Sequence, residues 1–289
     1  MKILVLGGTG YLGSKVCNAL LERSHDLFIT RRFMSDTSQI QNNERCTFVS
    51  ASNESIVCLK NENIEMLVNL SCNYGRDKTS YKEVLESNLF FPLNVMSIAV
   101  DMGIKKVLAI GTSLPIDLNM YSFSKGKFGE FGKQFVKECD ISFAEIELEM
   151  FYGSDEPEDR FLTKTIRNCI MGNELDVTLG TQKRDIIDVC DVVDAIVTVA
   201  ENMPVGYSKI PVGTGISPTV HDVIEYIYTQ TESKSAINWG KIPMRSGEPD
   251  CCCDVSKISG IFNIVGKEWN PIKWQIGLKD VIVAIKERM

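Results

Sequence analysis

Short apolar runs alternate with amphipathic segments along the first half of the chain. The uncharged run Ile3–Leu6 is typical of a strand that is buried on both faces of a parallel sheet. Apolar residues then recur at helical spacing over Tyr11–Glu22, which predicts a helix. A glycine cluster separates the two segments. The order of strand, glycine turn and helix is how a βαβ unit begins.

The same alternation continues to about residue 150. Further strands are predicted at His25–Thr30, Arg45–Ser50, Ile64–Leu70, Lys106–Ile110 and Ile141–Leu148. Helices are predicted at Tyr81–Met102 and Tyr121–Val136. Strands that alternate with helices predict an α/β fold with a doubly wound parallel sheet, in which ligands bind beyond the carboxyl ends of the strands.

The glycines after the first strand fit two dinucleotide-binding patterns. Gly7, Gly10 and Gly13 fit GxxGxxG, and Gly8, Gly10 and Gly13 fit GxGxxG. Such glycines allow a tight turn, a close approach of backbone N–H groups to a pyrophosphate, and close packing of helix on strand. The alternative is a plain glycine turn. We expect the site to be formed by Gly7, Gly10, Tyr11, Leu12, Gly13 and Leu70.

Two arginines, Arg31 and Arg32, follow the second predicted strand. An NAD-binding unit usually carries an acidic residue there, ~20 residues beyond the glycines, to bind the ribose 2′-hydroxyl. A guanidinium suits a 2′-phosphate instead, so the pair favours NADP(H), with Thr30 or its neighbours adding hydrogen bonds. The alternative is a pair of solvated surface arginines.

The pattern changes beyond Phe151. Helices are predicted at Phe161–Met171, Val192–Ala200, Thr219–Thr229 and Gln275–Glu287, strands at Asp185–Val189 and Lys209–Val212, and loops at Gly153–Asp159 and Gly240–Asp254. We therefore expect residues 1–150 to form the dinucleotide-binding domain, with a return segment near 182–212. Residues 151–289 should form mainly a smaller substrate-binding lobe over the cleft.

Composition narrows the function classes. The chain has 289 residues, 44% of them hydrophobic, and a net charge of −7, which argues against a nucleic-acid or membrane surface. The first strand starts at the N-terminus, so no signal peptide is expected. Of the ten cysteines, three are consecutive at Cys251–Cys253, where neighbours on a strand would point opposite ways. We therefore expect no metal site and reduced thiols in a cytoplasmic protein.

Candidate acid–base chemistry comes from Tyr121 and Lys125, which are four residues apart and would share one face of a helix. An ammonium lowers the pKa of a neighbouring phenol, which is about 10 when free. Ser113, just after a predicted strand, is placed to supply a hydroxyl. Together the three could pass a proton to or from a carbonyl/alcohol pair beside a nicotinamide. A chance match to YxxxK is the alternative.

These motifs resemble the extended short-chain dehydrogenase/reductases, the NAD-dependent epimerase/dehydratase group acting on nucleotide sugars. The resemblance runs nearly end to end and rests on Gly7–Gly13, Asn88, Ser113, Tyr121, Lys125, Arg184–Ile196 and the loop from Arg245. It implies that Ser113, Tyr121 and Lys125 form the catalytic triad. It also implies that Arg184 and Arg245 contact a substrate diphosphate, and that the protein forms a homodimer through paired helices, including the one bearing Tyr121.

Departures from the family pattern select among its reactions. Leu114 and Pro115 stand where dehydratases carry an Asp-Glu pair, and Met150 stands where an asparagine usually holds substrate. We therefore predict NADPH-dependent reduction of the 4-keto group of a nucleotide-linked 4-keto-6-deoxyhexose, in deoxysugar biosynthesis for lipopolysaccharide or capsule. The alternatives are a nucleotide-sugar epimerase with tightly held NAD(P) and a non-catalytic NADP(H)-sensing protein.

Overall fold

The computed structural model of the chain describes residues 1–76, 78–245, 247 and 249–289. Its strands are β1 Lys2–Leu6, β2 Asp26–Arg31, β3 Cys46–Ser50, β4 Met66–Asn69, β5 Lys106–Ile110, β6 Ser142–Leu148, β7 Met150–Tyr152, β8 Leu175–Asp176, β9 Ile186–Asp188, β10 Tyr207–Val212 and β11 Ile237–Asn238. Its helices are α1 Tyr11–Glu22, α2 Asn53–Val57, α3 Tyr81–Leu85, α4 Phe91–Asp101, α5 Met120–Glu138, α6 Phe161–Met171, α7 Val189–Glu201, α8 Val220–Thr231, α9 Ser256–Ile264 and α10 Trp274–Arg288, with a 3₁₀ turn η1 at Cys58–Asn61 and a π-helical turn η2 at Glu86–Phe90.

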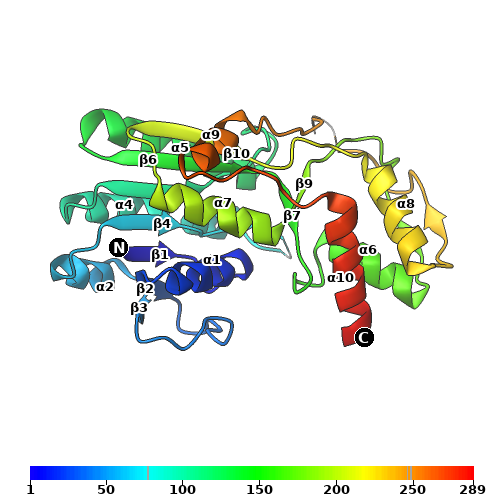
Figure 1. The fold of residues 1–289 in the computed structure, drawn as a ribbon, viewed down its shortest axis with the longest axis horizontal. Helices are drawn as coiled ribbons and strands as arrows, with labels where there is room; N and C mark the ends of the chain where they lie inside the picture. The colour runs from blue at the N-terminus through cyan, green and yellow to red at the C-terminus, as the bar shows by residue number, and fades with distance from the viewer. Residues whose placement is uncertain (77, 246, 248) are drawn as a thin grey trace. The chain divides into compact units, whose positions relative to one another are not determined.

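A seven-stranded sheet has the strand order β10-β6-β5-β4-β1-β2-β3 (Figure 1). Strand β1 pairs in parallel with both β2 and β4, and the chain therefore reverses its direction across the sheet between β1 and β4. In doubly wound sheets this reversal is where ligands bind. The predicted fold class is confirmed. Of the two candidate return strands, β10 joins this sheet, whereas β9 pairs with β7.

Strand β1 is buried on both faces because helices cover both sides of the sheet. Leu4 and Leu6 belong to a core with residues of α2, α4 and α5. On the opposite face, the space beside Gly8 is bounded by the side chains of Val5, Ile29 and Cys17, the last of which belongs to α1. Figure 1 shows α1 and α7 in front of the strands. This two-sided burial explains the uncharged run at the start of the sequence.

The helix predicted at Tyr81–Met102 is interrupted. In the structure, α3 and α4 are joined by the π-helical turn Glu86–Phe90. Pro92 stands in the first turn of α4 and has no N–H to donate to a preceding carbonyl, so the regular hydrogen-bond ladder cannot pass through this point. π-Helical turns of this kind are frequent at functional sites.

The chain divides into two compact units. Unit 1 consists of Met1–Glu147 and Val193–Ile210, and unit 2 of Leu148–Val192 and Pro211–Met289. The core of unit 2 is built from side chains of α6, α8 and α10 packed around the strands β7–β9, and it includes the buried Tyr152. The return segment of unit 1 thus covers most of α7 and the first part of β10.

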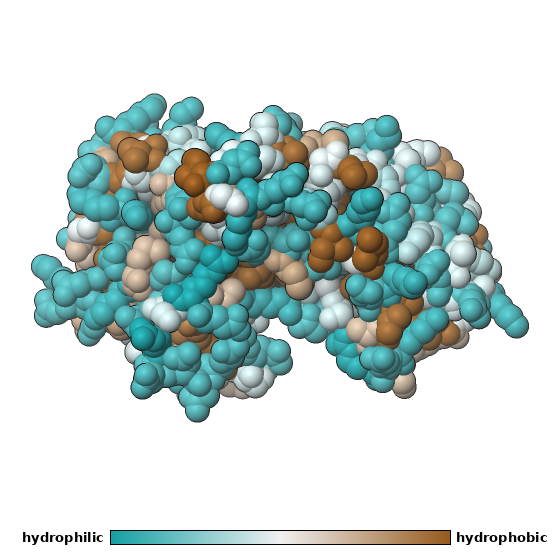
Figure 2. Space-filling model, viewed as in Figure 1, coloured by the Kyte–Doolittle hydropathy of each residue, from teal (hydrophilic) through white to brown (hydrophobic). Residues whose placement is uncertain are grey.

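On the face drawn in Figure 2, hydrophilic residues cover most of the surface, and apolar residues form separate patches between them. Among the described residues, no helix combines the length and the apolar character that crossing a membrane requires.

Candidate active site

The loop after β1 is folded tightly against the end of β4. Gly7 has a φ of +72°, and a Cβ there would lie 2.7 Å from the carbonyl carbon of Leu70. A Cβ on Gly13 would lie 2.9 Å from Gly8 Cα and closer still to the Gly7 carbonyl oxygen. At Gly10 the nearest atom to such a Cβ is 3.5 Å away, and no side chain caps the first turn of α1. The loop therefore fits a pyrophosphate approaching beside Gly10 and the start of α1.

Arg31 ends β2, and both Arg31 and Arg32 are exposed. The guanidinium carbon of Arg31 lies 5.5 Å from the centre of the Phe48 ring on the neighbouring strand β3. Thr30 does not share this surface, contrary to the expectation from the sequence. It is buried, and its hydroxyl donates to the Val5 carbonyl at 3.2 Å. The Thr30 hydroxyl is therefore turned into the fold, and Arg31 and Arg32 are the exposed polar side chains at the end of β2.

Tyr121 lies in the first turn of α5, where Asn119 caps the helix by accepting a hydrogen bond from the Ser122 N–H at 3.0 Å. Its ring centre is 5.0 Å from that of Tyr74. Desolvation raises the pKa of the Tyr121 phenol well above its usual range, Cys72 and Tyr74 raise it further, and a hydrogen bond with Thr112 opposes them. The phenol is thus protonated at neutral pH.

Lys125 lies one helical turn after Tyr121 and is 4% exposed. Its Nζ donates to the carbonyl of Ser71 at 2.6 Å and to that of Ile110 at 2.8 Å, just beyond β4 and at the end of β5. Burial lowers the pKa of this ammonium, whereas the nearby Cys72 and Glu145 raise it. The lysine therefore joins α5 to the carboxyl ends of two neighbouring strands.

Asn88 connects the interrupted helix to the same site. It lies in η2, is completely buried, and accepts a hydrogen bond from the Asn73 N–H at 2.7 Å. Its amide group donates to the Asn73 carbonyl at 2.9 Å and to the Ser124 hydroxyl at 3.0 Å. The Ser124 hydroxyl in turn donates to the Tyr121 carbonyl at 2.8 Å. Asn88 thus holds both the loop after β4 and the helical turn between Tyr121 and Lys125.

The hydroxyl bonded to Tyr121 belongs to Thr112, whereas the sequence singled out its neighbour Ser113. Both residues are partly exposed in the turn after β5, and the Leu114 N–H donates to Thr112 Oγ1 at 3.3 Å. Leu114 and Pro115 follow directly and bring no ionisable group to these two positions. Ser113 stays a candidate for holding a carbonyl oxygen.

Arg184 and the loop from Arg245 belong to segments that the structure brings together within unit 2. Arg184 is buried, and its Nη1 donates to the carbonyls of Lys183 and Pro249 at 2.6 and 2.8 Å. The Cys251 N–H donates to the Lys183 carbonyl at 3.1 Å, so the two segments are also joined by backbone. Arg245 is exposed. Arg184 therefore stabilises the loop that contains Pro249.

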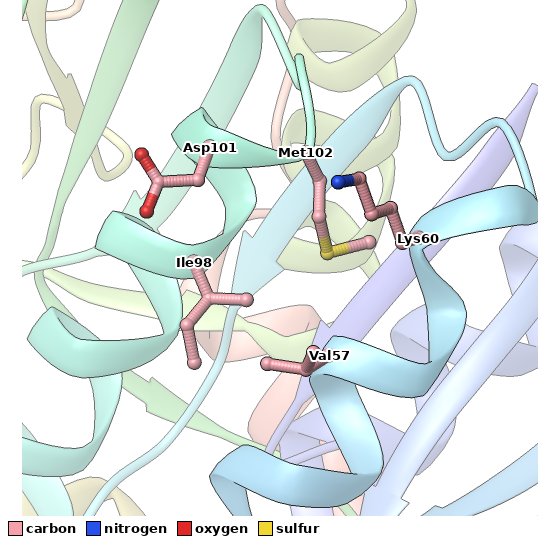
Figure 3. A pocket seen from close by; sticks show the side chains of 5 residues that line it. All are labelled: Val57, Lys60, Ile98, Asp101 and Met102. Carbon is pink, nitrogen blue, oxygen red and sulfur yellow. The ribbon is translucent and has the colours of Figure 1, made fainter.

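Unit 1 also has a surface groove of about 200 Å³ (Figure 3). It is lined by Val57, Lys60, Ile98, Asp101 and Met102, at the C-terminal ends of α2, η1 and α4. The helices of βαβ units run antiparallel to their strands, so these ends lie at the amino edge of the sheet. The groove is thus at the opposite edge from the glycine loop and Lys125, and it does not belong to the candidate active site.

Three residues of the site were not predicted from the sequence: Cys72 and Tyr74, which face the Tyr121 phenol, and Glu145, which acts on Lys125. Cys72 and Tyr74 follow closely on the carboxyl end of β4, and that position in a parallel sheet was the available signal. Glu145 lies inside β6, where the sequence pattern carried no comparable signal.

Comparison with known proteins agrees with this geometry. The model of the NAD dependent epimerase/dehydratase family matches residues 3–212. A CDP-abequose synthase of Salmonella muenchen is 26% identical over 255 residues, covering 86% of each chain. Another from Salmonella typhimurium is 27% identical over 309 residues, covering 97% of each.

Solved structures share the fold. A UDP-glucuronic acid 4-epimerase variant from Bacillus cereus, in complex with UDP-4-deoxy-4-fluoro-glucuronic acid and NAD, superposes with a TM-score of 0.87 at 21% identity over the full length of both chains. A UDP-glucose 4-epimerase from Thermotoga maritima gives 0.85 at 18% identity, covering 100% of this chain and 99% of its own. With a family match that spans the glycine loop, Tyr121, Lys125 and Arg184, the chain belongs to the NAD dependent epimerase/dehydratase family and is an NAD(P)-dependent enzyme of the oxidoreductase type.

Proposed function

We propose that this enzyme uses NADPH to reduce the 4-keto group of a nucleotide-linked 4-keto-6-deoxyhexose, with CDP as the nucleotide carrier. The observation that carries the proposal is the placement of Tyr121. Its phenol is hydrogen-bonded with Thr112. It lies one helical turn before the buried ammonium of Lys125, which the carbonyls of Ser71 and Ile110 hold in place. A fixed positive charge one helical turn away suits this phenol to give a proton to an alkoxide, because the charge stabilises the phenolate that remains.

Reduction of a ketone needs a hydride at carbon and a proton at oxygen. NADPH supplies the hydride when bound. In the proposal, Tyr121 gives its proton to the new alkoxide, and Ser113 or Thr112 holds that oxygen beforehand. Lys125 stabilises the phenolate that remains, because its positive charge lowers the pKa of the phenol as the proton leaves.

One further feature favours reduction over epimerisation, and another argues against dehydration. An epimerase returns the hydride to its own substrate and gains from a cofactor that never leaves, whereas a reductase must exchange its cofactor in each turnover. Arg31 and Arg32 after β2 suit the 2′-phosphate of NADPH, the form that cells keep as a reducing pool. Leu114 and Pro115 leave no acid–base pair for removing water, so another enzyme must have formed the ketone.

The substrate carrier is supported by the relatives and by unit 2. Two of the similar proteins are named CDP-abequose synthases, which makes a CDP-linked sugar the first candidate. Arg184 and Arg245 are the proposed contacts for the diphosphate, from segments that lie side by side. We further propose a homodimer in the cytoplasm. The exposed aromatic rings of Phe123 and Phe131 on α5, 39% and 43% accessible, support a partner on that helix.

The decisive assay follows NADPH absorbance with a CDP-linked 4-keto-6-deoxyhexose. We expect one NADPH to be oxidised per sugar reduced, and no oxidation with the corresponding 4-hydroxy sugar. Interconversion of two nucleotide sugars with catalytic cofactor and no net loss of NADPH would replace the proposal by the epimerase alternative. Binding of NADPH without turnover of any nucleotide sugar would favour the sensing alternative.

A further inference from the structure

A buried carboxylate lies beneath the helix that carries Tyr121 and Lys125. Glu145 belongs to β6, which pairs with β5, and it is 6% exposed. Two glycines make room for its side chain. A Cβ on Gly129 of α5 would lie 2.6 Å from Glu145 Cδ, and a Cβ on Gly111, just after β5, would lie 2.8 Å from Oε1. The carboxylate therefore fills the space between α5 and the end of β5.

The placement of these glycines brings the carboxylate close to Lys125. Gly129 lies one helical turn after Lys125 on the same face of α5. Gly111 follows Ile110, whose carbonyl accepts the Lys125 Nζ hydrogen bond. Glu145 thus lies against one glycine that follows Lys125 on α5 and another that follows the carbonyl to which Lys125 donates. The carbonyls of Ser71 and Ile110 satisfy donors of Lys125 but bring no formal charge.

The other charged and titratable groups around this pair are few among the described residues. Cys72, on the loop after β4, acts on both Lys125 and Tyr121. Tyr121 lies one helical turn before Lys125 on α5. From β10, the Tyr207 hydroxyl donates to Glu145 Oε2 at 2.7 Å, and Lys209 forms an ion pair with Glu147. Glu147 is on the same face of β6, because side chains alternate along a strand.

These contacts leave distinct roles for the two carboxylates. Glu147 forms an ion pair with Lys209, which lies on the same strand as Tyr207. Glu145 accepts from a neutral hydroxyl, and its carboxylate lowers the cost of burying the Lys125 ammonium. Burial raises the pKa of Glu145 and the charge of Glu147 raises it further, whereas Tyr207, Lys209 and Lys125 lower it. Burial lowers the pKa of Lys125, and Glu145 in turn raises it.

We propose that Glu145 is a positioning residue that supplies the counter-charge keeping Lys125 protonated beneath the reacting tyrosine. The proposal rests on the proposed function, in which the charge of Lys125 makes Tyr121 a better acid. Without the carboxylate, Lys125 becomes neutral at a lower pH. Tyr121 then loses the charge that stabilises its phenolate. The rate of proton donation therefore begins to fall at a lower pH than in the wild type.

The test is the pH profile of kcat/KM for NADPH oxidation in Glu145→Gln, which keeps the size of the side chain and an oxygen that can accept from Tyr207. At acid pH the variant should match the wild type, because Lys125 is protonated in both. The alkaline limb of its profile should lie about one pH unit lower. At pH values well above that limb, kcat/KM should therefore be approximately tenfold below the wild-type value. Glu147→Gln is the matched control and should leave the profile unchanged. Glu145→Asp retains the charge and should restore most of the alkaline limb.

Either of two results would overturn the proposal: an unchanged profile in Glu145→Gln, or a loss of equal size at every pH, as a merely structural role would produce. A second measurement needs no substrate. In protein labelled with ¹⁵N at lysine Nζ, the Lys125 signal, assigned through Lys125→Arg, should titrate about one pH unit lower in Glu145→Gln.

This titration separates the two proposals. A wild type without reductase activity but with the expected Lys125 titration would defeat the proposed function alone. A Lys125 signal that is indifferent to Glu145 would defeat the present inference alone. If Glu145→Gln does not fold, the wild-type protein still tests the inference. The ¹⁵Nζ chemical shift of Lys125 should then change over the pH range in which Glu145 becomes protonated.

Discussion

The two glycines at the start of α1 should respond differently to the same substitution. Gly13→Ala places a methyl group 2.9 Å from Gly8 Cα and closer still to the Gly7 carbonyl oxygen. These neighbours are backbone atoms and cannot swing away. The Gly7 carbonyl also accepts the Gly10 N–H at 3.2 Å, so the loop must open and lose this hydrogen bond. Gly10→Ala places its methyl 3.5 Å from the nearest atom, which is ordinary contact.

The magnitudes follow from these distances. Overpacking costs about 1–3 kcal/mol, and the lost hydrogen bond adds about 0.5–1.5 kcal/mol, so Gly13→Ala should lower the free energy of unfolding by roughly 1.5–4.5 kcal/mol. Gly is preferred to Ala at the N-cap of a helix, so Gly10→Ala should cost less than about 1 kcal/mol of stability. Its methyl group nevertheless occupies the approach to the pyrophosphate. Losing one charge-assisted hydrogen bond of about 1.5–3 kcal/mol should weaken NADPH binding roughly ten- to a hundred-fold.

Urea unfolding followed by circular dichroism and NADPH titration followed by fluorescence measure the two effects separately. We expect Gly13→Ala to lose both stability and NADPH affinity, and Gly10→Ala to lose affinity alone. Normal stability of Gly13→Ala would refute the close packing of α1 on the loop. An unchanged dissociation constant for NADPH in Gly10→Ala would refute the assignment of this loop to the pyrophosphate.

Four further variants probe the rest of the site. Tyr121→Phe should lower kcat about 10²–10⁴-fold with little change in NADPH affinity, because only the proton donor is lost; unaltered kcat would exclude Tyr121 as the acid. Arg31→Ala should narrow the preference for NADPH over NADH roughly ten- to a hundred-fold in titrations of both cofactors, and equal affinities in the wild type would contradict a 2′-phosphate contact. Arg184→Ala and Arg245→Ala should each raise the KM of the nucleotide sugar far more than that of NADPH; normal binding of nucleotide diphosphates by both variants would exclude the proposed substrate class.

Elements with strong local patterns were predictable from the sequence. The helices Tyr11–Glu22 and Phe161–Met171 and the strand Lys106–Ile110 have the predicted bounds, because apolar periodicity and flanking turn residues agree there. The π-helical turn was not predictable from periodicity, since it depends on how Pro92 and Asn88 meet the surrounding backbone.

The chemistry of the site was predictable to within neighbouring residues. Thr112 and Ser113 follow β5 in succession, and only the turn geometry decides which hydroxyl reaches Tyr121. Glu145 and Glu147 alternate with apolar residues, a pattern typical of a strand face in contact with solvent. Glu145 is covered because Gly129 lets α5 approach the sheet, a tertiary effect that the strand's own sequence does not encode.

The strand order has a consequence for how the nascent chain folds during its synthesis. β6 pairs with β5 on one side and with β10 on the other, yet β10 leaves the ribosome some sixty residues after β6. Until then the nascent sheet ends in an unpaired strand edge, the kind of surface that recruits other chains. Tyr207, whose hydroxyl donates a hydrogen bond to Glu145, belongs to β10 and becomes available only with that strand. A product truncated after residue 150 would therefore keep the glycine loop and Tyr121 but would expose both the edge of β6 and its inward-facing carboxylate.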